Sequence, residues 1–390
     1  MPKNWDRLRE DFPITKSYTY LANAAITPIP LPVYTEILKF YQEALYHGGT
    51  IWSDWIDAME ETRELYSKFI GADSKDEIAF THSTSEGMNI IAHILSDKGI
   101  VISNELEFPS TNLPWINKNS KNIKFLKSDY EGKIPILDIA KMIDKYYGKR
   151  GKQAKTILTS HVQFSNGFRQ DLEELGKLTQ RKDLHLVVNA TQSLGAMSLD
   201  VKNFNIDFMA SNGHKWMLSS FGIGTIYIKR KYLRDKDYFK PTFFSLSGQK
   251  KKDNFDNNTI LDSSYSATRF ELGTPHFQNI VALKAAIEYT SKIGIKQIEK
   301  RILGLTNYLI DKLVNIDIEI LSPVAEKKYR SGIIVFKPKK ENPSQIVMKL
   351  QKMNQIIVSA RGKGIRVSPH FYNNEEDIDN LISALVNILK

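Results

Sequence analysis

The feature that most constrains the fold is an alternation of short β-branched runs with amphipathic stretches between residues 77 and 230. Runs of this kind are typical of buried strands, and apolar residues spaced three or four apart indicate helices, here at 86–98 and 171–183 among others. The alternation predicts an α/β fold, in which helices cover both faces of a mostly parallel seven-stranded sheet. The predicted strands are 77–83, 99–105, 122–128, 155–162, 185–191, 207–213 and 224–230.

The rest of the chain predicts a long connection and a second domain. Residues 232–268 are polar, which indicates a surface connection that could order near an active site. A helix-rich stretch follows at 276–315, and the remaining residues alternate apolar runs with two helices, one near 344–354 and one ending at Leu389. We expect an N-terminal segment packed on the small domain, a large domain and a smaller C-terminal α/β domain, at 1–20, 21–275 and 276–390.

Composition limits the chemistry that this chain can perform. The 390 residues contain no cysteine, which excludes disulfides, thiolate metal sites and mechanisms that need a protein thiol. We expect no metal site. No apolar run reaches the roughly 20 residues of a membrane span, and the first residues lack the apolar stretch of a signal peptide, so a cytoplasmic protein without a membrane partner is expected.

The net charge of +10 raises the alternative of a nucleic-acid binder, which would show a strongly salt-dependent affinity. The lysines are spread along the chain, and the densest run, at 250–252, lies in a polar loop. We therefore expect a solvated lysine-rich surface that also favours anionic substrates, and no nucleic-acid partner.

Polar residues gather after two of the predicted strands. One strand ends at Asn189, with Gln192 just beyond it, and the next ends at Asn212, followed by Gly213, His214 and Lys215. Strand ends of neighbouring parallel strands meet at one edge of a sheet, so these side chains are expected to lie together. A lysine after a strand is ordinarily a surface charge, but here an asparagine, a glutamine and a histidine are expected beside it.

This arrangement resembles the class V aminotransferases and the cysteine desulfurase-like enzymes, whose signature is an acidic residue and a glutamine after one strand and S-G-H-K after another. Further counterparts occur in the same order: NAAITPIP at 23–30, STSEGMN at 83–89, SHVQFSNGFRQDL at 160–172, RFELGTP at 269–275 and IRVSPHFYN at 365–373. The resemblance implies an aspartate aminotransferase-like protein of fold type I that binds pyridoxal phosphate (PLP). Lys215 would carry the cofactor as a Schiff base and then move protons at the α-carbon of an amino-acid substrate.

The resemblance also implies how the cofactor phosphate is held. Thr84 and Ser85, just ahead of the predicted helix 86–98, fit this role, because the N-terminus of a helix attracts anions. The same stretch also fits an ordinary capping box formed by Ser83 and Glu86. By resemblance, His214 and Asn212 reach the phosphate as well, with Asn212 in place of the usual serine. Thr274 would come from a partner subunit, which implies a homodimer.

The cofactor ring and the substrate carboxylate need other partners. Phe108 stands where desulfurases carry histidine and is predicted to stack on the pyridine ring, the alternative being a core phenylalanine. By resemblance, Gln192 donates to the phenolic oxygen of the cofactor. Arg366 is the candidate for the substrate carboxylate, because a guanidinium makes a planar two-bond match to it. Arg361 is the second candidate, and the other arginines of the matching stretches, Arg169 and Arg269, are expected to be structural.

Two departures from the family pattern bear on the reaction. Desulfurases use a cysteine on a loop shortly before the carboxylate-binding arginine. In this chain, residues 360–366 contain neither that loop nor a cysteine, so persulfide-forming desulfuration is excluded. Asn189 replaces the family aspartate, whose charge keeps the pyridine nitrogen protonated. Asparagine should therefore disfavour full transamination and fit racemisation or elimination better.

We therefore expect a PLP enzyme that acts on an α-amino acid, in the branch that resembles isopenicillin N epimerase-like proteins and class V aminotransferases. Transamination, epimerisation and elimination in the manner of cystine or selenocysteine lyases remain open. So does a protein with weak or lost catalysis, which Asn189 alone supports. The substrate side chain is expected to contact loops near 23–30, 47–55 and 240–268.

Overall fold

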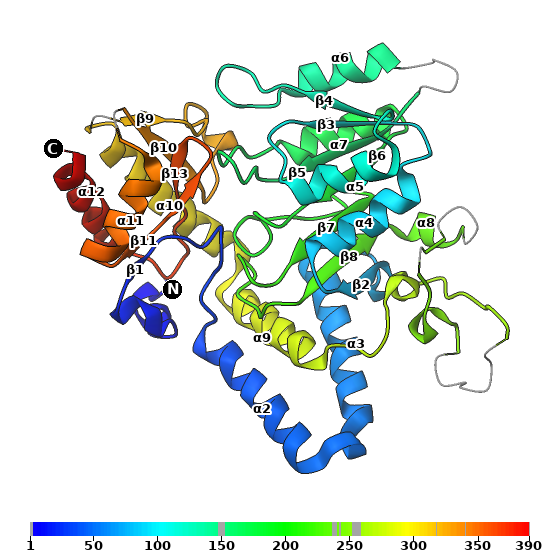
Figure 1. Ribbon diagram of the computed structural model, residues 1–390. Helices are drawn as coiled ribbons and strands as arrows, with labels where there is room; N and C mark the ends of the chain where they lie inside the picture. The colour runs from blue at the N-terminus through cyan, green and yellow to red at the C-terminus, as the bar shows by residue number, and fades with distance from the viewer. Residues whose placement is uncertain are drawn as a thin grey trace.

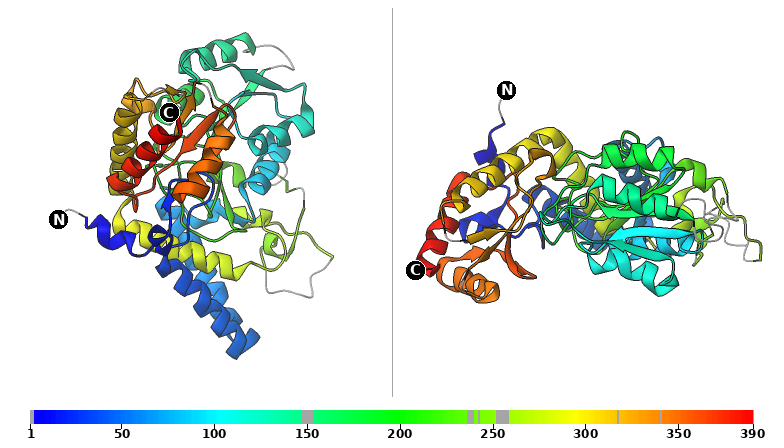
Figure 2. Two further views of the ribbon diagram at one scale, coloured as in Figure 1. Left: turned by 60° about the vertical axis from the view of Figure 1, so that its left-hand side comes forward. Right: turned by 90° about the horizontal axis from the view of Figure 1, so that it is seen from above.

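The computed structural model describes residues 3–146, 153–235, 240–241, 243–251, 259–316, 318–339 and 341–389. Its two parts, each built around one β-sheet, lie side by side (Figures 1 and 2). The long helix α9 (Phe277–Ile293) contributes apolar residues to the core of the larger part, and the next helix, α10 (Ile295–Leu313), packs in the smaller part. The domain division at residue 275 stays a prediction.

The larger part contains a seven-stranded sheet with the strand order β2-β8-β7-β6-β5-β3-β4. Strand β8 is antiparallel to both neighbours, and the other adjacent pairs are parallel. The predicted α/β fold with a mostly parallel seven-stranded sheet is confirmed. The strands are β2 (Ile78–Thr81), β3 (Ile100–Asn104), β4 (Ile123–Leu126), β5 (Ala154–Ser160), β6 (His185–Asn189), β7 (Phe208–Asn212) and β8 (Gly224–Ile228).

Both faces of this sheet are buried, because side chains alternate along each strand. Leu186 and Val188 of β6 belong to the apolar cluster on one face, and Val187 belongs to the cluster on the other. Loss of this apolar surface from water stabilises the layers. The first face packs against α9, α3 (Trp52–Phe69), α6 (Ile136–Tyr146) and α7 (Leu172–Arg181), and the second against α4 (Thr84–Leu95) and α5 (Pro109–Asn119).

Helix α4 begins earlier than the sequence predicted. It covers 84–95 instead of 86–98, because the Ser83 hydroxyl accepts the backbone N–H of Glu86 at 3.1 Å and so caps the helix ahead of Thr84. The Glu86 carboxylate accepts the backbone N–H of His82, not that of Ser83, so the reciprocal half of the capping box is not formed. Thr84 and Ser85 therefore lie inside the first turn of the helix, and the expectation that they precede it was wrong.

The smaller part has a four-stranded antiparallel sheet with the order β12-β13-β10-β9. The N-terminal segment packs on this smaller part. Strand β1 (Thr19–Tyr20) pairs with β11 (Ile356–Ile357) in a separate two-stranded sheet, and Arg9 makes two hydrogen bonds to Asp377. Helix α1 (Trp5–Arg9) belongs to this segment. The other elements are β9 (Ile318–Ile320), β10 (Ile334–Pro338), α11 (Pro343–Asn354), β12 (Ser359–Arg361), β13 (Gly364–Val367) and α12 (Glu375–Leu389).

Two further features lie outside the sheets. Helix α2 (Leu31–His47) and α3 form a hairpin that extends away from the body of the molecule (Figure 1). The polar connection at 232–268, which follows the short helix α8 (Arg230–Leu233), lies only partly within the described residues, and Lys252 is outside them. In the described part of the chain, no helix has the length and apolar character needed to cross a membrane.

Candidate active site

Lys215 lies in a tight turn immediately after β7. The backbone N–H of Leu218 donates to the Lys215 carbonyl at 2.9 Å, and Leu218 adopts a left-handed conformation with φ of 60° although it is not a glycine. A bulky residue in this conformation is strained, and such strain persists only where surrounding structure enforces it. Leu218 is fully buried, so packing holds the turn that presents Lys215.

The Lys215 ammonium faces an aromatic ring and two arginines. Its Nζ lies 5.8 Å from the centre of the Phe108 ring, which in turn packs edge-on against Phe164. Partial burial lowers the pKa of Lys215 to about 8, and the positive charges of Arg366 and Arg361 add to this effect. A substantial fraction of the amine is therefore neutral near pH 8, which is the form that attacks a carbonyl carbon.

Arg366 approaches the same place from β13 of the smaller part. Its side chain is 2% exposed, and Nη1 donates to the backbone carbonyl of Phe164 at 3.1 Å. Burial, followed by repulsion from Arg361, lowers the pKa of Arg366 to about 9. Its Nε is buried and makes no hydrogen bond to any described residue. This guanidinium retains hydrogen-bonding capacity for an anion.

Asn189 ends β6 in a fixed orientation. The backbone N–H of Thr191 donates to its Oδ1 at 3.0 Å, and its Nδ2 donates to the Thr111 hydroxyl at 2.8 Å. A backbone N–H can only donate, so the oxygen of the amide must face Thr191 and the NH₂ must face the other way. The carboxamide therefore presents N–H groups on the side of Thr111, where a carboxylate would present an acceptor.

Both the NH₂ group and the oxygen of the Gln192 side chain make hydrogen bonds. It donates to the carbonyl of Ala24 at 2.9 Å and accepts the indole N–H of Trp216 at 2.9 Å. Trp216 follows Lys215 directly, so Gln192 supports the lysine turn. Gly195 makes this packing possible, because a Cβ there would lie 2.3 Å from the Trp216 carbonyl. The NH₂ of Gln192 keeps a second hydrogen for the predicted cofactor contact.

The residues predicted for the phosphate lie at adjacent strand and helix ends. Thr84 is buried at the start of α4, with its hydroxyl 2.7 Å from that of Thr191, whereas Ser85 is exposed. His214 stacks on Phe221, and burial, with the charge of Lys215, lowers the pKa of His214 to about 4, which leaves the imidazole neutral near pH 7. Asn212 Oδ1 is buried without a described hydrogen-bond partner.

Three further residues singled out in the sequence make contacts of other kinds. Thr274 is exposed, and its predicted contact would be made across a subunit interface. Arg169 pairs with Glu299 at 2.7 Å, and Arg269 is fully buried and donates to the carbonyl of Leu233. Both contacts fit the structural roles expected for these two arginines.

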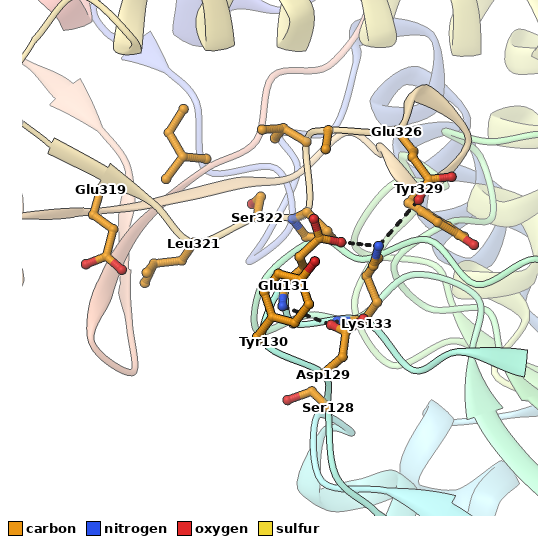
Figure 3. Close-up of a pocket in the computed structure, with 15 residues that line it drawn as sticks. Ser128, Asp129, Tyr130, Glu131, Lys133, Glu319, Leu321, Ser322, Glu326 and Tyr329 are labelled. Atoms are coloured by element: carbon orange, nitrogen blue, oxygen red, sulfur yellow. Dashed lines mark hydrogen bonds and ion pairs between the residues drawn. The ribbon is translucent and has the colours of Figure 1, made fainter. Parts of the chain in front are cut away.

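A separate pocket of about 530 Å³ lies between the loop before α6 and the segment after β9 (Figure 3). Lys133 pairs there with Glu131 and Glu326 and lies over the ring of Tyr329. None of the predicted site residues lines it. The pocket is thus distinct from the group around Lys215.

Sequence reasoning missed a buried polar cluster beside Phe108. The Glu107 carboxylate, 6% exposed, accepts hydrogen bonds from the backbone N–H and hydroxyl of Ser160 and from the amides of Gln163 and Asn104. Burial raises the pKa of Glu107, although these donors oppose the shift. The cluster fixes both chain segments that carry Phe108 and Phe164. Its only signal in the sequence is a glutamate directly before Phe108, which is not distinctive.

The residues around Lys215 fit a cofactor that carries an aldehyde, a flat ring and a phosphate. They provide an amine with a lowered pKa, an exposed aromatic side chain, the start of a 12-residue helix and, at Asn212, a buried amide oxygen that has no hydrogen-bond partner among the described residues. A bound group with its own hydrogen-bonding atoms could satisfy such polar groups. Among the described residues, no cluster of three or more His, Asp or Glu side chains could hold a metal ion.

Comparison with known proteins connects this geometry to a family. A probable cysteine desulfurase of Pyrococcus abyssi is 29% identical over 413 residues, covering 98% of this chain and 97% of the relative. The apo cysteine desulfurase of Thermococcus onnurineus NA1 superposes with a TM-score of 0.85 at 25% identity, covering 100% of this chain and 98% of that one.

A C-DES mutant with glycine covalently linked to its PLP cofactor shares the fold, with a TM-score of 0.87 at 18% identity over 99% of this chain and all of that chain. The model described as "Aminotransferase class-V" matches residues 19–381. The chain therefore belongs to the aminotransferase class-V family of PLP enzymes, as the sequence motifs around Lys215 had led us to expect.

Proposed function

We propose that this protein is a PLP-dependent enzyme that acts on an α-amino acid and uses Lys215 to bind the cofactor and to move the substrate proton. The observation that carries the proposal is the environment of Lys215, an amine with a pKa of about 8 that faces Phe108 and lies within the electrostatic influence of Arg366. An ordinary surface lysine has neither the lowered pKa nor these neighbours.

When bound, PLP supplies a conjugated ring that withdraws electrons from the substrate α-carbon. In our proposal, Lys215 would hold the cofactor covalently through its amine, with loss of water from the cofactor aldehyde, and once free of the cofactor it would accept the proton of the substrate α-carbon. Arg366 holds the substrate carboxylate, and the Phe108 ring covers the cofactor face and excludes water. Neutral His214, Asn212, Thr84 and Ser85 hold the phosphate, and Gln192 donates to the phenolic oxygen.

The reaction is proposed to be transamination, epimerisation or elimination, and not persulfide-forming desulfuration. The sequence contains no cysteine, so no thiol of this chain can accept the sulfur. Of these three reactions, the orientation of Asn189 favours elimination and epimerisation over transamination. Its N–H groups can donate to a neutral ring nitrogen but cannot stabilise a protonated one. Mass spectrometry of reactions with a panel of amino acids would distinguish a keto acid, an inverted amino acid and an eliminated fragment.

The proposal also includes a homodimer in which Thr274 of each chain reaches the phosphate of the other subunit. Thr274 is exposed in the single chain and follows Gly273, which has a positive φ of 68° and open space around it. A segment of this kind is available for contact with a second copy.

The assignment of Lys215 can be tested directly. We expect the purified protein to be yellow and to lose its visible band in Lys215→Ala. Borohydride reduction followed by peptide mapping should attach the cofactor to Lys215. Lys363→Ala, which removes an exposed lysine, is the control and should keep the band. Cofactor attached to a different lysine, or bound PLP that is never attached, would refute the assignment.

A further inference from the structure

The hairpin formed by β12 and β13 carries two arginines on one face. Its register pairs Ser359 with Arg366 and Arg361 with Gly364. In an antiparallel pair, opposite residues share a face, and so do alternate residues along each strand. Arg361 and Arg366 are therefore diagonal neighbours on the same face, at a spacing of roughly 7–8 Å between backbone positions. Gly362, with a φ of 54°, allows the short turn that brings the two strands together.

Among the described residues, these two positive charges are not neutralised. Within the described ranges, no ion pair joins either arginine to a carboxylate, and the only hydrogen bond of the Arg361 side chain is to the carbonyl of its own neighbour, Ala360. Arg361 is exposed, whereas Arg366 is buried. The charge of Arg361 acts on both Arg366 and Lys215 and lowers the pKa of each. The positive charges of Arg361, Arg366 and Lys215 therefore act on one another around Lys215.

We propose that Arg361 binds a second anionic group of the substrate, so that the preferred substrates are amino acids with an acidic side chain, or the matching dicarboxylic keto acids. This inference rests on the proposed function, in which Arg366 holds the α-carboxylate. A substrate with a neutral side chain would satisfy Arg366 alone. A dicarboxylic substrate places one carboxylate on each guanidinium and relieves their mutual repulsion. The same two-bond geometry that suits Arg366 to a carboxylate applies to Arg361.

The test uses the cofactor-loaded protein and unreactive ligands. Dissociation constants for succinate and glutarate, and for butyrate and pentanoate, can be measured from the change in cofactor absorbance and by calorimetry. We expect the dicarboxylates to bind on the order of tenfold or more tightly than the monocarboxylates, since a charge-assisted hydrogen bond contributes at least that factor. Arg361→Gln should remove most of the difference, because it should weaken dicarboxylate binding far more than monocarboxylate binding. Arg361→Lys should restore part of the difference.

Lys363→Gln is the matched control, because it removes an exposed positive charge from the same turn. It should preserve the preference for dicarboxylates. Equal affinity for both ligand classes in the wild type would overturn the inference. So would an Arg361→Gln variant that loses affinity for both classes alike, because Arg361 would then hold the α-carboxylate. Either result can occur while cofactor is attached to Lys215, so failure of this inference is distinguishable from failure of the proposed function.

Discussion

The charge of Lys215 depends on its surroundings. Its ammonium form is destabilised by burial and by Arg366 and Arg361, so its pKa lies near 8, well below the ordinary lysine value. We predict that the apo protein binds PLP covalently at a rate that rises with pH and has a midpoint near this pKa, because only the neutral amine reacts. Arg366→Gln should move the midpoint upward by removing one source of repulsion. Formation of the visible band between pH 6 and 10 measures both values, and a wild-type midpoint near 10 would contradict the prediction.

Asn189 is the residue whose chemistry departs most from the family pattern. Its oxygen is occupied by the Thr191 N–H, and its NH₂ faces the Thr111 hydroxyl. We predict that Asn189→Asp protonates the cofactor ring nitrogen and increases half-transamination relative to the wild type, since a carboxylate favours a neighbouring positive charge. The ring-nitrogen chemical shift of labelled PLP and the rate of pyridoxamine formation test this. A ring nitrogen that is already protonated in the wild type would make ordinary transamination the leading reaction.

At the scale of elements, a buried ion pair connects α3, β2 and the segment that leads to Thr274. Arg63, 1% exposed, makes two hydrogen bonds to Glu271 and a third to the carbonyl of Ile78, and Glu271 also accepts the backbone N–H of Phe80. This pair helps to attach β2, an edge strand, to the helix that covers it.

Arg63→Ala should lower the free energy of unfolding by about 3–5 kcal/mol, because it leaves the Glu271 carboxylate buried without its partner. Lys68→Ala is the control, since it breaks an exposed pair with Glu64 on the same helix and should change stability by less than about 1 kcal/mol. Urea denaturation measures both variants. A similar small effect in each would show that Arg63 is not a structural anchor.

At the scale of the whole molecule, the exposed apolar residues of the α2–α3 hairpin support the proposed homodimer. Tyr41, Leu45 and Tyr46 of α2 are 55%, 75% and 78% exposed, on a hairpin that projects from the body (Figure 1). Large exposed apolar groups clustered on one element indicate an interaction surface.

We predict a solution mass of twice that of one chain, measured by light scattering. The double variant Tyr41→Lys and Leu45→Lys should shift this mass toward a single chain, because it places charges in an apolar contact. Leu137→Lys, on the exposed face of α6, is the control and should remain dimeric. A wild-type protein that is a single chain at micromolar concentration would exclude the homodimer and the proposed role of Thr274 in a second subunit.

The seven strands of the larger sheet, and the place of Lys215 after one of them, could be predicted from the sequence alone. Seven apolar β-branched runs are local signals, and the rule that parallel strands end at one edge of a sheet was enough to group Asn189 with Lys215. The start of α4 was misjudged by two residues, because helix ends depend on which side chain caps them, and Ser83 and Thr84 were both suitable.

The contacts that support the site, and the charges that surround it, are visible only in the folded chain. Asn189 meets Thr111 across 78 positions of the chain, and Glu107 meets Gln163 across 56, and no local pattern marks either contact. The shared face of Arg361 and Arg366 depends on the register of one hairpin, since a shift by one residue would point one of them away. The physical reason is the same in each case: periodicity reports which face of an element is buried, whereas side-chain hydrogen bonds and convergent charges depend on where separate elements meet.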